Sequence, residues 1–333
     1  MKVKKIMTIC AAVFATLMII GCSKKTETVN SFGFYEDLDE AKVIAKKQKK
    51  DILLAVTMED LDDDSTSFRQ NVLASEEFKS LLGNKFVGVN FDFGPTAYAD
   101  TEVQPGATKE EEEAAEKRTE LILKNMQFVR TLDVQYTPVV FILSADGYYV
   151  TQFEYSENFE NAKTFADEIN SCEYLLAEMK SLFAAVEKGS VEERMNALDQ
   201  IYYKGNGGVT YENLFRQAPE IDKKNETGLV SKLYMEAVLL DCMNFYAVGD
   251  SESALDVLVK AAEGTALDPS EKQEAYYMAG YLLITAGSED IDQVIEYFNL
   301  AIKASPDDER VPSIKDLIET ISTMSESQEQ ENQ

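Results

Sequence analysis

The sequence predicts an α/β domain followed by an all-α domain of helical repeats, and three observations lead to this fold class. In the first half, short uncharged apolar runs alternate with stretches of helical spacing, which is the pattern of a sheet covered by helices. After Phe159 there is no further strand pattern, and apolar residues recur only at helical spacing. Within that second half, two segments match each other at an offset of about 40 residues, which is typical of stacked helical hairpins.

The first domain is expected over residues 32–170. Asp37 can cap its first helix, the run 52–56 is uncharged like a strand buried on both faces, and Ala145-Asp146-Gly147 is a hairpin turn. We therefore predict a sheet with parallel central strands and an antiparallel edge hairpin, with helices on its faces. The expected elements, in order, are helix 38–50, strand 52–56, a helix through Phe68, Val72 and Phe78, strand 86–91, loop 94–108, helix 109–132, strand 139–143 and strand 148–153.

The second domain is expected over residues 171–325, with a disordered polar tail at 326–333. The matching segments pair Ala254-Leu255 with Val294-Ile295 and Leu258 with Phe298, and each follows another helix. The second hairpin resembles a tetratricopeptide repeat, through Ala279-Gly280-Tyr281, Phe298, Ala301-Ile302 and a terminating Pro306. Tyrosines such as those at 276 and 277 are expected to pack between repeats.

Composition excludes several classes of function. The chain has 333 residues, with 60 acidic and 32 basic side chains and a formal net charge of −28. This balance argues against binding nucleic acid or anionic lipid through a basic face, because phosphate contacts need clustered Lys or Arg. The absence of His excludes Ser-His-Asp and Cys-His catalysis and His-type zinc sites. We therefore predict no nucleic-acid partner, no cofactor and no metal ligand set.

The amino end has the pattern of an export signal over residues 1–21. Lysines at positions 2, 4 and 5 precede an uncharged run from Ile6 to Ile20, and the junction is Gly21-Cys22. Ile19-Ile20-Gly21-Cys22 resembles a bacterial lipobox, which implies cleavage before Cys22 and acylation of that residue. Residues 22–31 then form a tether, and the protein is held to a membrane of the bacterial envelope. An uncleaved anchor, or a signal cut elsewhere, is the alternative.

Two cysteines remain after this processing, Cys172 and Cys242, so one intramolecular disulfide is the maximum. Both lie in apolar-periodic helical stretches, and we expect buried core thiols.

The stretch from Ala41 through Phe153 resembles the thioredoxin-like superfamily. The landmarks are Lys50 to Leu54 entering the first strand, Phe86-Val87 with Asp92, and Val134 to Val139 before the third strand. In that family a cis proline precedes the third strand and faces the redox loop, so the resemblance implies that Pro138 is the cis proline.

The sequence departs from this family at the redox motif. The positions of Cys-x-x-Cys fall on Asp62-Asp63-Asp64-Ser65, so both thiols are replaced, by Asp62 and Ser65. Disulfide exchange needs an attacking thiolate and a resolving thiol, and neither is present. We expect no thiol oxidoreductase activity at this site, and we identify no catalytic residue elsewhere.

The acidic loop around this position has a second interpretation. Asp60, Asp62 and Asp64 alternate like the first ligands of a calcium loop. The glycine and the distal Glu of such a loop are absent, which favours a solvated acidic cap at a helix amino terminus.

The predicted function is a lipid-anchored bacterial envelope protein with a redox-inactive thioredoxin-like domain and a helical-repeat platform that binds another protein. The alternative is an enzyme, either metal-assisted at Asp60–Asp64 or using an unrecognised thiol pair. A purely structural or antigenic surface lipoprotein is a third hypothesis.

Overall fold

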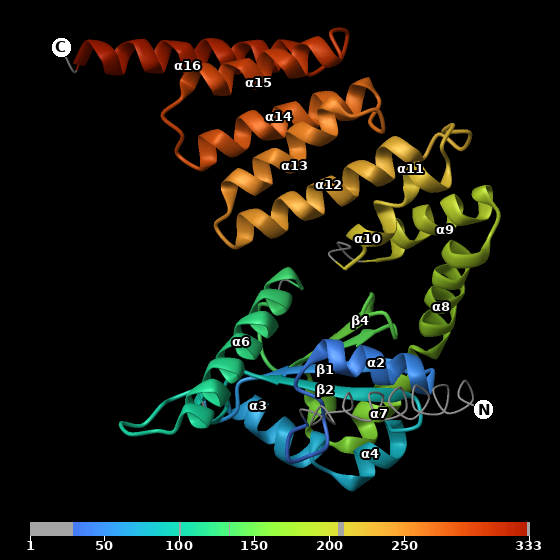
Figure 1. Ribbon diagram of the computed structural model, residues 1–333. Helices are drawn as coiled ribbons and strands as arrows, with labels where there is room; N and C mark the ends of the chain where they lie inside the picture. Colours follow the sequence, from blue (N-terminus) through green and yellow to red (C-terminus); the bar gives the residue numbers. More distant parts are fainter. Residues whose placement is uncertain (1–28, 100, 133, 206–209, 332–333) are drawn as a thin grey trace, which may run out of the picture.

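The computed structural model describes residues 29–99, 101–132, 134–205 and 210–331. The predicted signal, Cys22 and the tether up to residue 28 lie outside these residues. Figure 1 shows an α/β domain below and a stack of helices above, joined on one side by α8 (Glu173–Lys188) and α9 (Val191–Lys204). No described helix has the length and apolar character that crossing a bilayer requires.

The sheet has four strands in the order β2-β1-β3-β4. β1 and β2 are parallel, whereas β3 is antiparallel to both β1 and β4. The prediction of parallel central strands was therefore wrong for the pair β1 and β3. Asp92 at the end of β2 lies beside Thr57, and Val139 at the start of β3 lies beside Val56, so the connection leaves and re-enters the sheet at one edge. The strands are β1 Asp51–Thr57, β2 Phe86–Asp92, β3 Val139–Leu143 and β4 Tyr149–Glu154.

The expected helix through Phe68, Val72 and Phe78 is divided into three pieces. A helical turn of π type, Arg69–Leu73, follows α3, and Ser75 then starts a new helix by accepting from the Phe78 N–H at 3.1 Å. The expected loop 94–108 also contains the short helix α5. The helices of this domain are α2 Leu38–Gln48, α3 Asp63–Phe68, α4 Glu76–Leu82, α5 Pro95–Ala99, α6 Lys109–Thr131 and α7 Ala162–Ser171, with a 3₁₀ turn at Glu157–Glu160.

Helices cover both faces of the sheet. Figure 1 shows α2 on the side of the helical stack and α3, α4 and α7 on the opposite side. On that opposite side, aromatic rings fill the space, with Phe68 and Phe159 at 4.8 Å and Phe78 stacked on Phe165 at 5.7 Å between centroids. α6 rises from the sheet edge and ends near the helical stack.

The helical domain confirms the expected hairpin repeats. α12 packs on α13, α13 on α14 and α14 on α15, so the hairpins stack in chain order. Small residues allow this close packing: a Cβ on Gly280 would lie 3.0 Å from the buried ring of Phe298. The elements are α10 Glu212–Phe215, α11 Ala218–Ile221, α12 Val230–Ala247, α13 Ser251–Glu263, α14 Pro269–Thr285, α15 Ile291–Ala304 and α16 Val311–Glu331. Residues 326–331 are thus helical where the sequence predicted a disordered tail.

The two cysteines differ in burial. Cys242 is buried in α12, as expected, but Cys172 is only half-buried because it lies between the end of α7 and the start of α8. Both thiols are free.

The two domains share one hydrophobic core, which runs from Phe34 in the α/β domain to Leu240 in α12. At the junction, the fully buried Tyr211 donates its hydroxyl to the Tyr149 carbonyl of β4, and the Tyr149 N–H donates to Thr210 Oγ1 at 2.7 Å. The Tyr211 ring also lies 6.2 Å from the Phe183 ring of α8. The outer edge of β4 is therefore held by the helical domain.

Candidate functional site

The structure brings the degenerate redox positions and the proline loop together at one edge of the sheet. Asp62 caps the amino end of α3, Ser65 lies in the first turn of that helix, and Pro138 directly precedes β3. The peptide bond between Thr137 and Pro138 is cis. The Thr137 hydroxyl donates to Asp62 Oδ2 at 3.0 Å, which joins the two loops.

The Asp62 carboxylate is fully engaged in holding this edge. Its Oδ1 accepts from the Asp64 N–H at 3.1 Å, which caps α3, and its Oδ2 accepts from Ser65 Oγ at 2.6 Å as well as from Thr137. Ser65 is completely buried. The Ser65 hydroxyl, at a position where the family resemblance predicts a redox thiol, therefore faces the Asp62 carboxylate in the protein interior.

The other acidic side chains of the loop turn to separate partners. Asp60 has a left-handed backbone with φ 66°, and its carboxylate accepts from Thr96 Oγ1 at 3.2 Å. Asp64 accepts from the phenol of Tyr155, and this bond raises the pKa of Tyr155 to about 12. Within the described chain, no group of three or more His, Cys, Asp or Glu side chains is placed to hold a metal ion. The carboxylates that could be calcium ligands do not converge.

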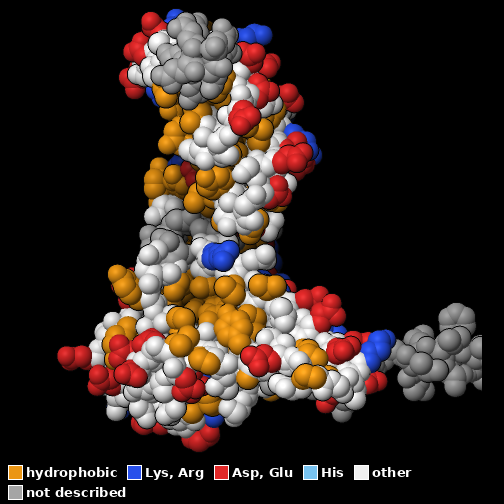
Figure 2. Space-filling view, turned by 90° about the vertical axis from the view of Figure 1, so that its left-hand side faces the viewer, with side chains coloured by type: hydrophobic (Ala, Val, Ile, Leu, Met, Phe, Trp, Pro, Cys, Tyr) orange, Lys and Arg blue, Asp and Glu red, His pale blue; other side chains and the backbone are white. Residues whose placement is uncertain are grey.

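A hollow of about 320 Å³ lies beside the cis proline. Tyr136 stands at its rim with 83% of its surface exposed. Figure 2 shows hydrophobic side chains gathered at the level where the α/β domain meets the helical stack. The lining of the hollow includes Val134, Tyr136, Pro138, Phe141, Gln152 and Tyr155.

A buried charge cluster lies behind the acidic loop, and sequence reasoning missed it. Arg69 pairs with Asp92 at 2.9 Å and with Glu59, and Asp92 Oδ1 accepts from both Thr57 Oγ1 and the Glu59 N–H at 2.9 Å. The guanidinium carbon lies 4.9 Å from the ring centre of Phe32. The cluster fixes the start of the acidic loop against the end of β2. The only indication of this cluster in the sequence was Arg69 itself, a charged residue within a stretch of apolar helical periodicity.

The helical domain carries a second candidate surface on α12 and α14. An acidic cluster lies at the start of α14, and its members are Glu236, Asp268, Glu271 and Glu274. Burial and, after it, repulsion from the other three carboxylates raise the pKa of Glu271. The cluster therefore holds negative charge that is only partly balanced by Arg310 and Lys232.

The last turns of the same two helices expose apolar side chains. These residues form what we call the apolar row. Tyr281 lies seven residues after Glu274 on α14, and Met243 lies seven residues after Glu236 on α12, so each pair shares a helix face. The members of the row are Met243, Phe245, Tyr246, Val248, Tyr281 and Ile284, which are between 36% and 63% exposed.

Comparison with known proteins bears on both domains. Residues 38–170 match the family described as a thioredoxin-like domain, and residues 229–327 match a family described as an uncharacterised protein C-terminal domain. One solved structure, titled DsbH Oxidoreductase, is 17% identical over 45% of this chain and 90% of that chain, with a TM-score of 0.30. The search of curated proteins found no match. The family match and the strand order together identify residues 38–170 as a thioredoxin-like domain, which is followed here by an all-helical domain.

Proposed function

We propose that this protein is a lipid-anchored component of the bacterial envelope whose thioredoxin-like domain is redox-inactive and whose helical domain binds a basic partner protein. The observation that carries the binding role is the exposed apolar row of α12 and α14, next to an acidic cluster on the same helices. Exposed apolar side chains with charged side chains on the same helices are typical of protein interaction sites.

The replacement of both redox thiols supports the inactive state. The Ser65 and Thr137 hydroxyls both donate to the Asp62 carboxylate, so the Ser65 hydroxyl is already engaged, and neither Asp62 nor Ser65 supplies a thiol. The two free cysteines lie in different hydrophobic clusters, Cys172 against the shared core and Cys242 in the core of α12 to α14. Purified residues 23–333 should not accelerate insulin reduction by dithiothreitol. A rate above buffer that disappears in Cys172→Ser or Cys242→Ser would contradict the proposal.

Charge supports the choice of a basic partner. The chain carries a net charge of −28, and the carboxylates around Glu271 repel one another. A cationic surface relieves that repulsion and is attracted over the screening length of about 8–10 Å at physiological salt. Binding should weaken as salt rises, mainly through a slower on-rate.

The binding role is tested on the full mature chain, because the shared core means that neither domain can be cut away without exposing apolar surface. Crosslinking pull-down from intact cells should recover fewer partner molecules with Met243→Ser/Tyr281→Ser than with wild type. The matched control, Tyr174→Ser/Val191→Ser, removes two exposed apolar side chains elsewhere on the helical domain and should retain the partner.

The rival site is the hollow beside Pro138. Tyr136→Ser alters its rim without touching the helical domain. Loss of the partner with Tyr136→Ser but not with Met243→Ser/Tyr281→Ser would move the binding role to the thioredoxin-like domain. Binding that is indifferent to salt would contradict the basic partner.

The anchor is tested by metabolic labelling with a radioactive fatty acid. Wild type should be labelled and Cys22→Ser should not, because the acyl chains are attached to Cys22. Equal labelling of both proteins, or labelling of neither, would reject the anchor.

A further inference from the structure

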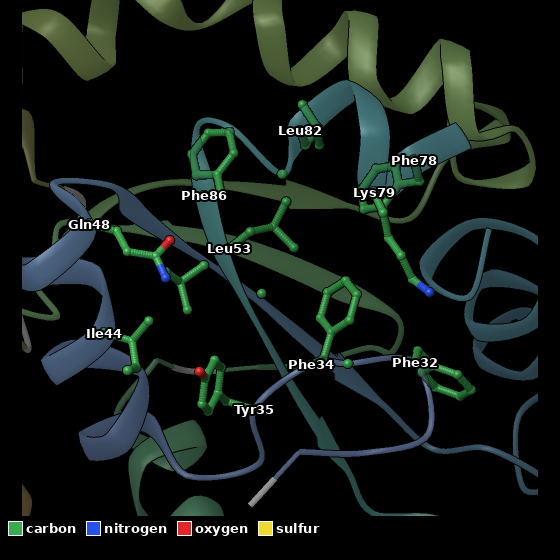
Figure 3. Close-up of a pocket in the computed structure, with 14 residues that line it drawn as sticks. Phe32, Phe34, Tyr35, Ile44, Gln48, Leu53, Phe78, Lys79, Leu82 and Phe86 are labelled. Carbon is green, nitrogen blue, oxygen red and sulfur yellow. The ribbon is translucent and has the colours of Figure 1, made fainter. Parts of the chain in front are cut away.

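An apolar hollow of about 220 Å³ lies at the outer edge of β2, between the segment 32–35 and the helices α2 and α4. Figure 3 shows the rings of Phe34 and Phe86 in this hollow, with Gln48 on one side and Lys79 on the other. Gly88 permits the close approach of the segment, because a Cβ there would lie 2.6 Å from the Phe34 ring. The hollow belongs neither to the proline site nor to the helical domain.

Lysines lie on three segments that border this hollow, which are the end of α2, α4 and the residue before β2, and Lys79 lines the hollow itself. Lys47 and Lys49 are exposed at the end of α2 and form no ion pair within the described residues. Lys50 donates to the Gly83 carbonyl at 2.6 Å, on the rim of the hollow. Lys79 on α4 and Lys85 before β2 complete the group, which we call the lysine corner, and each has one exposed carboxylate partner.

The helix dipole explains only part of this arrangement. Cations at the carboxyl end of a helix are favourable, which accounts for Lys47 on α2. Lys79 lies in the last turn of α4 and is explained in the same way, but the dipole does not account for Lys85, which precedes β2. Composition argued against a basic face, but a net charge of −28 describes the whole chain and not the placement of its lysines.

The amino-terminal segment leads into the same corner. Tyr35 pairs with the edge of β2, since its N–H donates to the Gly88 carbonyl and its carbonyl accepts from the Asn90 N–H, both at 2.9 Å. Val29 forms a bridge with Tyr35. The seven residues from Ser23 to Val29 span at most about 25 Å when fully extended. An acylated Cys22 would therefore keep Val29 within that distance of the bilayer, and Val29 pairs with Tyr35, which lies on the β2 edge.

We propose that the lysine corner faces the membrane and contacts anionic phospholipid headgroups, with the exposed lysines on the phosphates and the apolar hollow toward the interface. This inference rests on the proposed anchor at Cys22. The anchor supplies the attachment and the corner supplies the orientation, because a juxtamembrane lysine is attracted to an anionic surface while the acidic remainder of the chain is repelled.

The test replaces the natural anchor with an artificial one, so that it does not depend on acylation. Residues 23–333 carry an amino-terminal hexahistidine tag, which is the only source of imidazole because the chain has no His. Binding is measured at low salt to vesicles that contain a nickel-chelating lipid in phosphatidylcholine, with or without phosphatidylglycerol. We expect phosphatidylglycerol to tighten binding about fivefold or more, since one lysine near an anionic surface contributes about that factor.

Two neutralised pairs separate the corner from general charge effects. Lys47→Gln/Lys49→Gln should abolish the tightening, whereas Lys223→Gln/Lys224→Gln, whose side chains are 74% and 82% exposed on the helical domain, should keep it. Thermal unfolding shows whether each variant is folded. Two results would overturn the inference: weaker binding to vesicles with phosphatidylglycerol than without it, or an equal loss of the tightening in both double variants. Either result would leave an acidic protein as the partner of the lysine corner. If the vesicle test gives the expected result but Cys22 is not labelled by fatty acid, only the proposed anchor is overturned.

Discussion

The interiors of the two domains are stabilised by different kinds of contact. At the carboxyl edge of β1 and β2, the thioredoxin-like domain buries Arg69, Asn90 and Asp92 with their partners. The core of the helical hairpins consists mainly of small and apolar side chains, and the close contacts fall at residues such as Gly280 against Phe298. The backbone N–H and C=O groups of a helix bond to one another, so stacked helices require mainly complementary side-chain packing. Loops that leave a sheet edge lack these bonds, so their backbone groups require polar side chains as partners.

This difference shows where the chain is sensitive to substitution. In the thioredoxin-like domain, one buried charge supports the loop that carries Asp62 and faces Pro138. In the helical domain, the caps that begin α13, α14 and α15 are exposed carboxylates that each accept one backbone hydrogen bond. The predictions below compare the two kinds of contact, in order of decreasing effect.

Removal of Arg69 should have the largest effect. Arg69→Met leaves Glu59 and Asp92 buried without a cation, and breaking a buried pair in this way costs about 3–5 kcal/mol. Urea denaturation of the mature chain measures the loss. The control Lys163→Met removes an exposed pair with Asp167 and should change stability far less, because solvent screens exposed pairs. Equal effects of the two substitutions would mean that the buried cluster does not support the sheet edge.

The Arg69 cluster also shows what sequence reasoning could not reach. Strands and helices with a clear apolar period were predictable, because the period reports which face is buried. The partners of Arg69 lie in separate elements that only the folded sheet brings together. The antiparallel pairing of β1 with β3 was missed for the same reason, since it depends on the path of the chain around α6. Pro138 and Asp62 were placed through family landmarks, but the hydrogen bond that joins their loops needed coordinates.

A substitution at the domain junction should have the next largest effect. A Cβ on Gly205 would lie 2.1 Å from the ring of Tyr211, which is fully buried between the domains. Overpacking of this kind costs about 1–3 kcal/mol, so Gly205→Ala should lower stability by that amount in a single unfolding transition. Gly249→Ala, at a residue with open space around it, provides a comparison for backbone strain alone. Two separate transitions in wild type would contradict the shared core.

Helix caps offer a direct comparison between the domains. Asp290 accepts one hydrogen bond, from the Gln293 N–H at 2.9 Å, and its replacement by Ala should cost about 1 kcal/mol. Asp62→Ala should cost about 2 kcal/mol, because it also leaves the Ser65 and Thr137 hydroxyls without their acceptor. Paired denaturation curves measure the difference. If Asp290→Ala is the more damaging change, the Asp62 bonds do not hold the proline loop.

The smallest effect is a gain in stability at the acidic cluster. Because the pKa of Glu271 is raised, its carboxylate is less favourable in the folded protein than in the unfolded chain, and the penalty exists at neutral pH. As pH falls through the raised pKa, the folded protein takes up the proton first and the penalty disappears. Glu271→Gln should therefore stabilise the protein at neutral pH by less than about 1 kcal/mol, since the site is partly exposed.

The gain should be absent below the ordinary carboxyl pKa of about 4, where Glu271 is neutral in both states. Thermal unfolding at the two pH values measures this, with Glu252→Gln on the exposed start of α13 as the matched control. The same substitution should weaken the binding of a basic partner. That partner gains affinity by relieving the repulsion among the carboxylates, and Glu271→Gln has already removed it. If Glu271→Gln both stabilises the protein and weakens partner binding, the two properties belong to one site. A stability gain that is equal at both pH values would contradict a charge penalty at Glu271.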